Sequence, residues 1–182
     1  MTQLDNIRLE TPRLYLIPLT YHQLLKYAKI DYSLEKELGL VKRTREVTKE
    51  FKDTLERYLI PYINLNPSHI LYATVWAMIL KEDNVLVGDI GFNAAPSDKG
   101  VMEVGYSTYP DFKNKGYMTE ALSLLRKWAF EQPDVKIIIA QTDKDNLPSH
   151  KVLSKNDFSP FAEADTFYWW RLDKDPQTVE DS

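Results

Sequence analysis

The chain contains no cysteine among its 182 residues, so disulfide bonds, thiolate metal sites and a cysteine nucleophile are all excluded. Histidine is scarce as well. His22, His69 and His150 are far apart and lack the spacing of metal ligands, so we expect no metal site. No apolar run approaches the ~20 residues of a membrane span. The sequence therefore predicts a protein without a membrane segment.

Neither positive nor negative charge is in large excess. The net charge is −4, whereas a dedicated nucleic-acid binder usually carries a basic surplus. The first six residues lack the charged and apolar regions of a signal peptide. We therefore expect a cytoplasmic protein with no nucleic-acid partner.

What the chain does have is enough apolar content, 43%, for one well-formed core. Its first half has strand-like and helical stretches in turn, and Pro67 ends the second helix. We predict a strand over 8–17, a helix that begins after Thr20, and a long amphipathic helix over 47–63.

The second half is richer in strands. The apolar run 135–140 is typical of a strand buried on both faces. We find no repeat and no linker, so we expect one mixed α/β domain over 1–173 and a polar tail over 174–182. The predicted elements are strands at 71–80, 85–92, 101–107 and 135–140, helices around 121–129 and 149–155, and a hairpin of 158–161 with 167–172.

One loop carries a chemical signal because it joins a predicted strand to the start of a predicted helix. Backbone N–H groups at a helix start have no partner within the helix, and the helix dipole adds positive charge there. Such a site suits an anionic ligand. The loop comprises Lys113, Asn114, Lys115, Gly116, Tyr117, Met118 and Thr119.

A second polar group follows the next strand of the same βαβ unit. Asn146 and Ser149 stand where ligands of such folds bind, near the carboxyl ends of strands. They have two readings: they hydrogen-bond the polar arm of a ligand, or they cap the helix that follows.

Several short segments resemble, in order and spacing, the GNAT family of acetyl-CoA-dependent N-acetyltransferases. Within it they are most similar to the Rim-like branch of ribosomal-protein N-terminal acetyltransferases. The resemblance covers residues 7–172. The segments are Glu10-Thr11-Pro12-Arg13-Leu14-Tyr15-Leu16, Val87-Gly88-Asp89-Ile90-Gly91-Phe92, Glu103-Val104-Gly105-Tyr106, Thr119-Glu120-Ala121, Asn146-x-x-Ser149 and Val152-Leu153-x-Lys155-Asn156-x-Phe158.

The resemblance implies a mixed sheet with two splayed parallel strands, 101–108 and 135–141, flanked by helices. Pantetheine would lie between them, held by N–H groups near Ser107 and Thr108. The Lys113–Thr119 loop would bind the pyrophosphate. The chain departs from the family at Met118, where a small residue is usual, and at Asp157, where glycine is usual.

The acceptor amine must lose a proton before it attacks, so a general base is needed. Alternation along the strand places Glu103, Gly105 and Ser107 on one face. By resemblance we expect Glu103 to be the base, working through water; the alternative is a surface carboxylate. Leu153 stands where many relatives carry a tyrosine acid, so the general acid is unassigned.

The resemblance implies acetyl transfer from acetyl-CoA to a primary amine by direct attack in a ternary complex. The acceptor would be a protein N-terminus or a small amine, and a homodimer is compatible with this reading. The alternative is a non-catalytic acyl-CoA-binding sensor or regulatory module. A nucleotide-binding domain is a third reading, but neither a Gly-Lys-Ser/Thr nor a Gly-x-Gly-x-x-Gly motif supports it.

Overall fold

Hydrogen bonds join eight strands into one open sheet within residues 7–175, the part of the chain that the computed structural model describes. The strand order is β1-β2-β3-β4-β5-β6-β8-β7. The strands are β1 (Leu9–Glu10), β2 (Leu14–Pro18), β3 (Val75–Leu80), β4 (Val85–Phe92), β5 (Val101–Thr108), β6 (Ile137–Asp143), β7 (Ser159–Glu163) and β8 (Phe167–Asp173).

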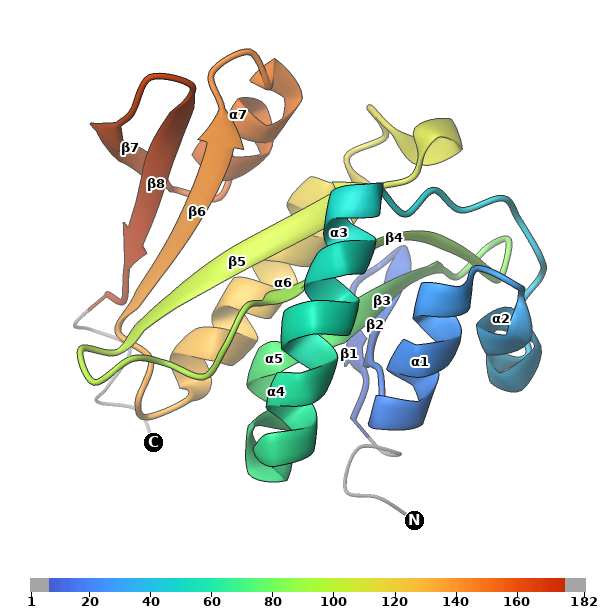
Figure 1. Ribbon diagram of the computed structural model, residues 1–182. Coiled ribbons are helices and arrows are strands. Elements are labelled where there is room, and N and C mark those ends of the chain that lie inside the picture. Colours follow the sequence, from blue (N-terminus) through green and yellow to red (C-terminus); the bar gives the residue numbers. More distant parts are fainter. Residues whose placement is uncertain (1–6, 176–182) are drawn as a thin grey trace.

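The parallel strands β5 and β6 pair over only part of their length. The two strands are in register only at Val101–Glu103 against Ile137–Ile139, and beyond that point they diverge (Figure 1). All the other neighbouring strands are antiparallel. The predicted mixed sheet with splayed parallel strands is therefore confirmed.

Helices cover both faces of the sheet. In Figure 1, α1, α3 and α4 lie in front of the sheet and α6 lies behind it. The helices are α1 (Tyr21–Lys29), α2 (Ser33–Leu38), α3 (Lys49–Thr54), α4 (Ile60–Leu65), α5 (Ile70–Ala73), α6 (Tyr117–Glu131) and α7 (Leu147–Ser154). None of the helices in this part of the chain is long and apolar enough to cross a membrane.

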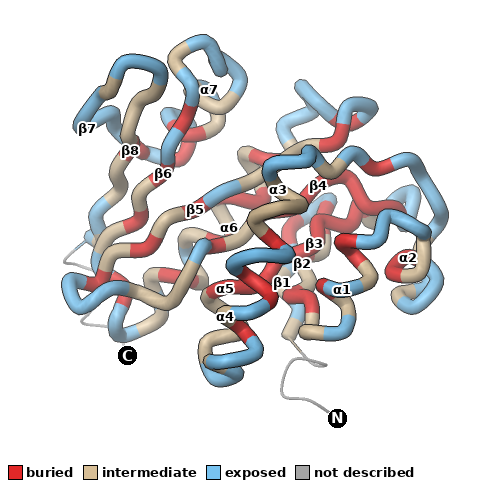
Figure 2. Tube along the Cα trace, viewed as in Figure 1, coloured by how far each residue is buried: buried red, intermediate tan, exposed pale blue. Residues whose placement is uncertain are grey.

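The core forms because apolar side chains line the inner faces of these layers. Every residue of β3 is buried, and almost every residue of β4, as the red tube of these central strands shows (Figure 2). The predicted stripe on α6 is buried at Ala121, Leu122, Leu125 and Ala129. Burial of a side chain such as leucine contributes about 1.5–3 kcal/mol, so this stripe fixes α6 on the sheet.

Two of the predicted strands differ from our expectation, the first because a turn divides it and the second because it begins later. The stretch 8–17 is two antiparallel strands, because Thr11 N–H donates to Leu14 O at 3.0 Å and turns the chain. The stretch 71–80 starts as helix α5, and the strand begins only at Val75. A short apolar run does not by itself distinguish a helix from a strand, and that ambiguity explains the second error.

The predicted long helix over 47–63 is interrupted. A π-helical turn at Leu55–Leu59 separates α3 from α4, and Ile60 N–H donates to Leu55 O. Pro61 lacks an N–H group, and its ring would clash with the carbonyl four residues earlier in a regular α-helix. The wide turn directly precedes this proline. Helix α2, which ends at Gly39 with φ of 67°, was not predicted.

Later elements are shifted by a few residues. β6 starts at Ile137 rather than 135, α7 covers Leu147–Ser154, and β7 covers Ser159–Glu163. Lys174 N–H still donates to Lys136 O at 2.8 Å. The rest of the predicted polar tail, from residue 176, lies outside the described residues.

Candidate active site

The loop between β5 and α6 has the geometry of an anion site. Gly116 precedes the first turn of α6 with φ of 80°, in the left-handed region that favours glycine. Buried Phe112 anchors the loop, while Lys113, Asn114 and Lys115 are exposed. The free N–H groups of the first helical turn therefore face solvent beside basic side chains.

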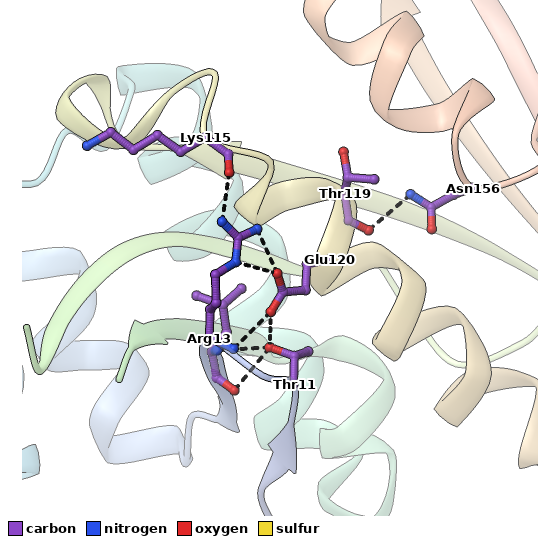
Figure 3. A network of polar contacts seen from close by, with 7 residues as sticks. Thr11, Arg13, Lys115, Thr119, Glu120 and Asn156 are labelled. Atoms are coloured by element: carbon purple, nitrogen blue, oxygen red, sulfur yellow. Dashed lines mark hydrogen bonds and ion pairs between the residues drawn. The ribbon is translucent and has the colours of Figure 1, made fainter. Parts of the chain in front are cut away.

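Arg13 holds this loop from the other end of the chain. Its Nε donates to Glu120 Oε2 at 2.7 Å, and its Nη1 donates to Lys115 O at 3.0 Å (Figure 3). Thr11 Oγ1 donates to the other carboxylate oxygen of Glu120. Burial acts to raise the pKa of Glu120, but hydrogen bonds from Thr11 and Arg13 leave it below its usual value. The ionised carboxylate fixes Arg13, and Arg13 fixes the loop.

Asn156 ties α7 to α6 on the other side of the loop. Its buried amide donates to Thr119 O at 3.2 Å (Figure 3) and to Val152 O at 3.0 Å. The two helices that border the loop are therefore held together by one polar side chain.

A pocket of about 500 Å³ opens where β5 and β6 diverge. It brings together most of the predicted binding residues: Ser107, Thr108, Lys113, Asn114, Gly116, Tyr117, Met118, Thr119, Asn146 and Ser149. Lys115 does not line it; its side chain lies against Phe112, with Nζ 5.3 Å from the ring centroid. Lys151 and Lys155 also line the pocket and were not predicted. Their charge adds to that of Lys113, which suits a ligand with several phosphate groups.

Individual predicted residues have different roles in this pocket. The Met118 side chain is only 5% exposed and packs in the core. Asn146 Oδ1 accepts from Ser149 N–H at 3.2 Å, so the capping reading holds for that atom. Leu153 is fully buried in the core. His150 Nε2 lies 3.0 Å from Asp143 O, and its ring packs on Tyr168 and Trp170.

The backbone of β5 offers hydrogen-bond donors to the gap between the splayed strands. Glu103 O accepts from Asn93 N–H, and Tyr109 N–H donates to Val87 O. The backbone groups of the odd-numbered residues from 103 to 109 therefore point toward β4. Because backbone groups alternate along a strand, the N–H groups of Tyr106 and Thr108 point the other way, toward the gap. The N–H of Ser107 faces β4.

A second pocket, of about 410 Å³, lies between α3 and strands β4 and β5. It shares Tyr106 and Ser107 with the first pocket, so the two cavities meet at the end of β5. Two carboxyl groups line it: Glu46, which is exposed, and Asp89, which is 4% exposed. Apolar side chains form most of the remaining wall.

Glu103 lies on the expected face of β5 but lines neither pocket. Burial raises the pKa of this carboxyl, and a hydrogen bond with the Asn93 side chain opposes the rise. Ser107 is four positions after Glu103, which is about 13 Å along a strand. A proton could therefore reach Glu103 from the junction of the pockets only through intervening groups or water.

Sequence reasoning missed two polar residues at this junction. Asp89 is a charged residue within the apolar stretch 85–92, and that contrast was the available signal. Tyr106 donates through its hydroxyl to Ser149 O at 3.4 Å, and burial raises its pKa to about 12. Within residues 7–175 no cluster of three His, Asp or Glu side chains is arranged to hold a metal ion.

These features define the class of the protein. Residues 13–159 match the acetyltransferase (GNAT) domain family, so the chain belongs to this family and is an acyltransferase. Members of the family use acetyl-CoA, and the pocket lined by Lys113, Lys151 and Lys155 fits such a phosphate-bearing molecule.

Particular relatives agree with this assignment. The chain is 30% identical over 152 residues to the uncharacterized N-acetyltransferase YjdG of Bacillus subtilis, covering 84% of this chain and 89% of that protein. Its fold is similar to that of a ribosomal-protein-S5-alanine acetyltransferase from Vibrio fischeri, with a TM-score of 0.67, 16% identity, and coverage of 94% and 98%. RimL, a ribosomal L7/L12 alpha-N-protein acetyltransferase solved with coenzyme A, has a TM-score of 0.66, 15% identity, and coverage of 92% and 98%.

Proposed function

We propose that this protein transfers the acetyl group of acetyl-CoA to the nitrogen of a primary amine by direct attack in a ternary complex. The observation that carries the proposal is the junction of two pockets at Tyr106 and Ser107. One pocket has a helix N-terminus and lysines for the phosphates, and the other is free for an acceptor.

In this proposal the thioester lies at the end of β5. The Thr108 N–H, which points into the gap between the strands, polarises the thioester carbonyl and stabilises the developing oxyanion. The amine enters from the pocket beneath α3 and forms the amide bond as the carbon–sulfur bond breaks. Glu103 receives the proton of the amine through water, since burial raises its pKa and makes the carboxylate a stronger base.

Turnover of acetyl-CoA tests the proposal. Purified protein is incubated with acetyl-CoA and a panel of primary amines and short peptides, and CoA release is measured together with the mass of the acetylated product. We expect release that depends on the amine.

Tight CoA binding without turnover on any amine or peptide would instead favour the non-catalytic acyl-CoA-binding module. Leu153 supports this alternative, because a buried leucine cannot replace the tyrosine acid of many relatives. The cytoplasmic location and the homodimer stay predictions. Fractionation of cells and light scattering of the purified protein, respectively, test them.

A further inference from the structure

The pocket beneath α3 has a buried carboxyl group at its floor. Asp89 lies in the middle of β4, and its partner across the antiparallel register is Ser107. Directly opposed residues project to the same face of a sheet. The Asp89 side chain therefore lies on the acceptor side, next to the point where the two pockets meet.

Two tyrosine hydroxyl groups lie on one side of this carboxyl group. Tyr27 from α1 donates to Asp89 Oδ2 at 2.8 Å, and the Tyr27 hydroxyl lies 3.2 Å from that of Tyr109, beyond the end of β5. Arg45 lowers the pKa of Asp89 but bonds elsewhere: its Nε donates to Glu35 Oε1 and its Nη1 to Tyr27 O, each at 2.7 Å, and its buried Nη2 has no partner among the described residues. Arg45 also packs over the Tyr27 ring, 4.6 Å from the centroid.

Asp89 is thus a buried acid without a cation of its own. In the described part of the chain, the ion pairs of lysine and arginine leave Asp89 out. A buried carboxylate without a counter-charge is costly, so burial raises the pKa of Asp89 to about 7, although Tyr27 and Arg45 act to lower it. A cationic ligand in the pocket would supply the missing charge.

The wall above Asp89 is largely apolar. Its apolar side chains are those of Val47, Phe51, Leu59 and Val75, and Thr48, Thr54 and Thr74 share the lining. A volume of about 410 Å³ is within the range of small-molecule sites. Such a cavity suits an ammonium group carried on a hydrophobic body, with the charge at Asp89 and the body beneath α3.

We propose that Asp89 binds the ammonium group of the acceptor, and that the acceptor is a primary amine with an apolar body. The inference rests on the proposed acetyl transfer and names the substrate class of that site. Bound in this way, the nitrogen lies beside Ser107, at the end of the strand whose backbone faces the thioester. The ammonium group loses one proton to solvent before it attacks, the second goes to Glu103 through water as the amide forms, and CoA leaves as its thiolate.

Direct binding tests the inference without turnover. CoA-loaded protein is titrated by calorimetry at about pH 8 with benzylamine and with benzyl alcohol, its neutral analogue. We expect benzylamine to bind at least tenfold more tightly in the wild type, and Asp89→Asn to abolish that preference. Asn keeps the size of the side chain and can still accept from Tyr27. Asp83→Asn, in the exposed β3–β4 turn, is the matched control.

The pH dependence gives a second readout, which a structural role of Asp89 alone would not produce. Benzylamine affinity is expected to fall as the pH drops below about 7, because protonation removes the charge of Asp89. Tyr27 lowers the pKa of Asp89, so Tyr27→Phe should move this loss to higher pH. Equal binding of amine and alcohol, or an Asp89→Asn variant that binds benzylamine like the wild type, would overturn the proposal.

Steady-state kinetics separate this inference from the proposed function. With phenylalkylamines or with peptides that begin with an apolar residue, Asp89→Asn should raise KM for the amine at least tenfold and leave KM for acetyl-CoA unchanged. The two substrate arms show whether the amine is a small molecule or a peptide terminus. Asp89-dependent binding without CoA release would refute the proposed acetyl transfer but not the role of Asp89. Turnover unaffected by Asp89→Asn would refute the role of Asp89 but not acetyl transfer.

Discussion

Asp89 on β4 lies directly opposite Ser107 on β5, and this pair marks the junction of the two pockets. In the sequence, a turn and most of a strand lie between the two residues. On one side of the pair are the helix N-terminus and lysines of the proposed phosphate site. On the other side is the apolar pocket beneath α3. The chemistry that we propose takes place between them.

Arg13 positions the loop that we propose to bind the phosphates, so its loss should weaken the use of acetyl-CoA. Arg13→Ala removes a hydrogen bond to Lys115 O and the ion pair with Glu120. A charge-assisted bond contributes about 1.5–3 kcal/mol, and ~1.4 kcal/mol corresponds to a factor of ten. We expect KM for acetyl-CoA to rise roughly tenfold with little change in KM for the amine.

Arg8→Ala is the control for this variant, because Arg8 pairs with Glu10 at 4.0 Å and packs over the Tyr15 ring, neither of which belongs to the loop. Steady-state kinetics at varied acetyl-CoA measure the effect. An Arg13→Ala variant with the KM of the wild type would show that the loop keeps its shape without this tether.

Gly88 permits the close approach of β4 to β5. A Cβ atom at this position would lie 2.4 Å from Ser107 O, so Gly88→Ala must push the strands apart. Overpacking of this kind costs typically about 1–3 kcal/mol. We expect a lower free energy of unfolding in urea and a lower kcat/KM, because the Thr108 N–H moves with the strand.

The matched control is Gly105→Ala on the same strand pair, where an added Cβ would meet no atom within 4 Å. Its unfolding free energy should stay within about 0.5 kcal/mol of the wild type. If the two variants are equally stable, the close contact at Gly88 does not constrain the sheet.

Glu103 as a general base predicts a distinct pH profile. Glu103→Gln should lower kcat/KM about 100-fold, within the usual range for proton transfer. In the wild type kcat at saturating amine, which the charge of Asp89 does not limit, should fall as the pH drops through the raised pKa of Glu103, because the protonated carboxyl group cannot accept the proton of the amine. The variant should lose this acidic limb of kcat, while Glu131→Gln, at the exposed end of α6, should retain it. An unchanged rate across pH would exclude Glu103 as the base.

Asp89 should make the fold less stable at higher pH. Its pKa rises from 3.8 in a free side chain to about 7 in the fold, so the folded state favours the protonated form. At about 1.4 kcal/mol per unit, this corresponds to roughly 4 kcal/mol. That stability is fully present below about pH 4 and is lost as the pH rises to about 7.

Urea unfolding of the wild type and Asp89→Asn at about pH 5 and pH 8 measures this loss. The stability of the wild type relative to the variant should fall by roughly 2–4 kcal/mol between these two values. A constant difference would mean that Asp89 is as well solvated in the fold as in the unfolded chain.

The amino-acid sequence predicted the parts of the site that are local in the chain. The Lys113–Thr119 loop and the helix after it follow from a glycine and an apolar stripe within fifteen residues or so of each other. The leucine at 153, where many relatives carry a tyrosine, is likewise read from one position, although its burial is known only from the structure. Local signals failed where apolar runs were short, at 71–74, and where Pro61 forced a wide helical turn.

Only the tertiary structure decided which groups share a pocket. Arg13 is about a hundred positions from Lys115, and Tyr27 is 62 positions from Asp89, so no spacing rule relates them. Sequence alone determined a mixed α/β domain with a basic loop before a helix, because backbone propensity and helix-end electrostatics act over a few residues, and the resemblance to a known family indicated the acetyltransferase fold. The pairing of strands placed Asp89 opposite Ser107, because strand register depends on hydrophobic packing across the whole sheet.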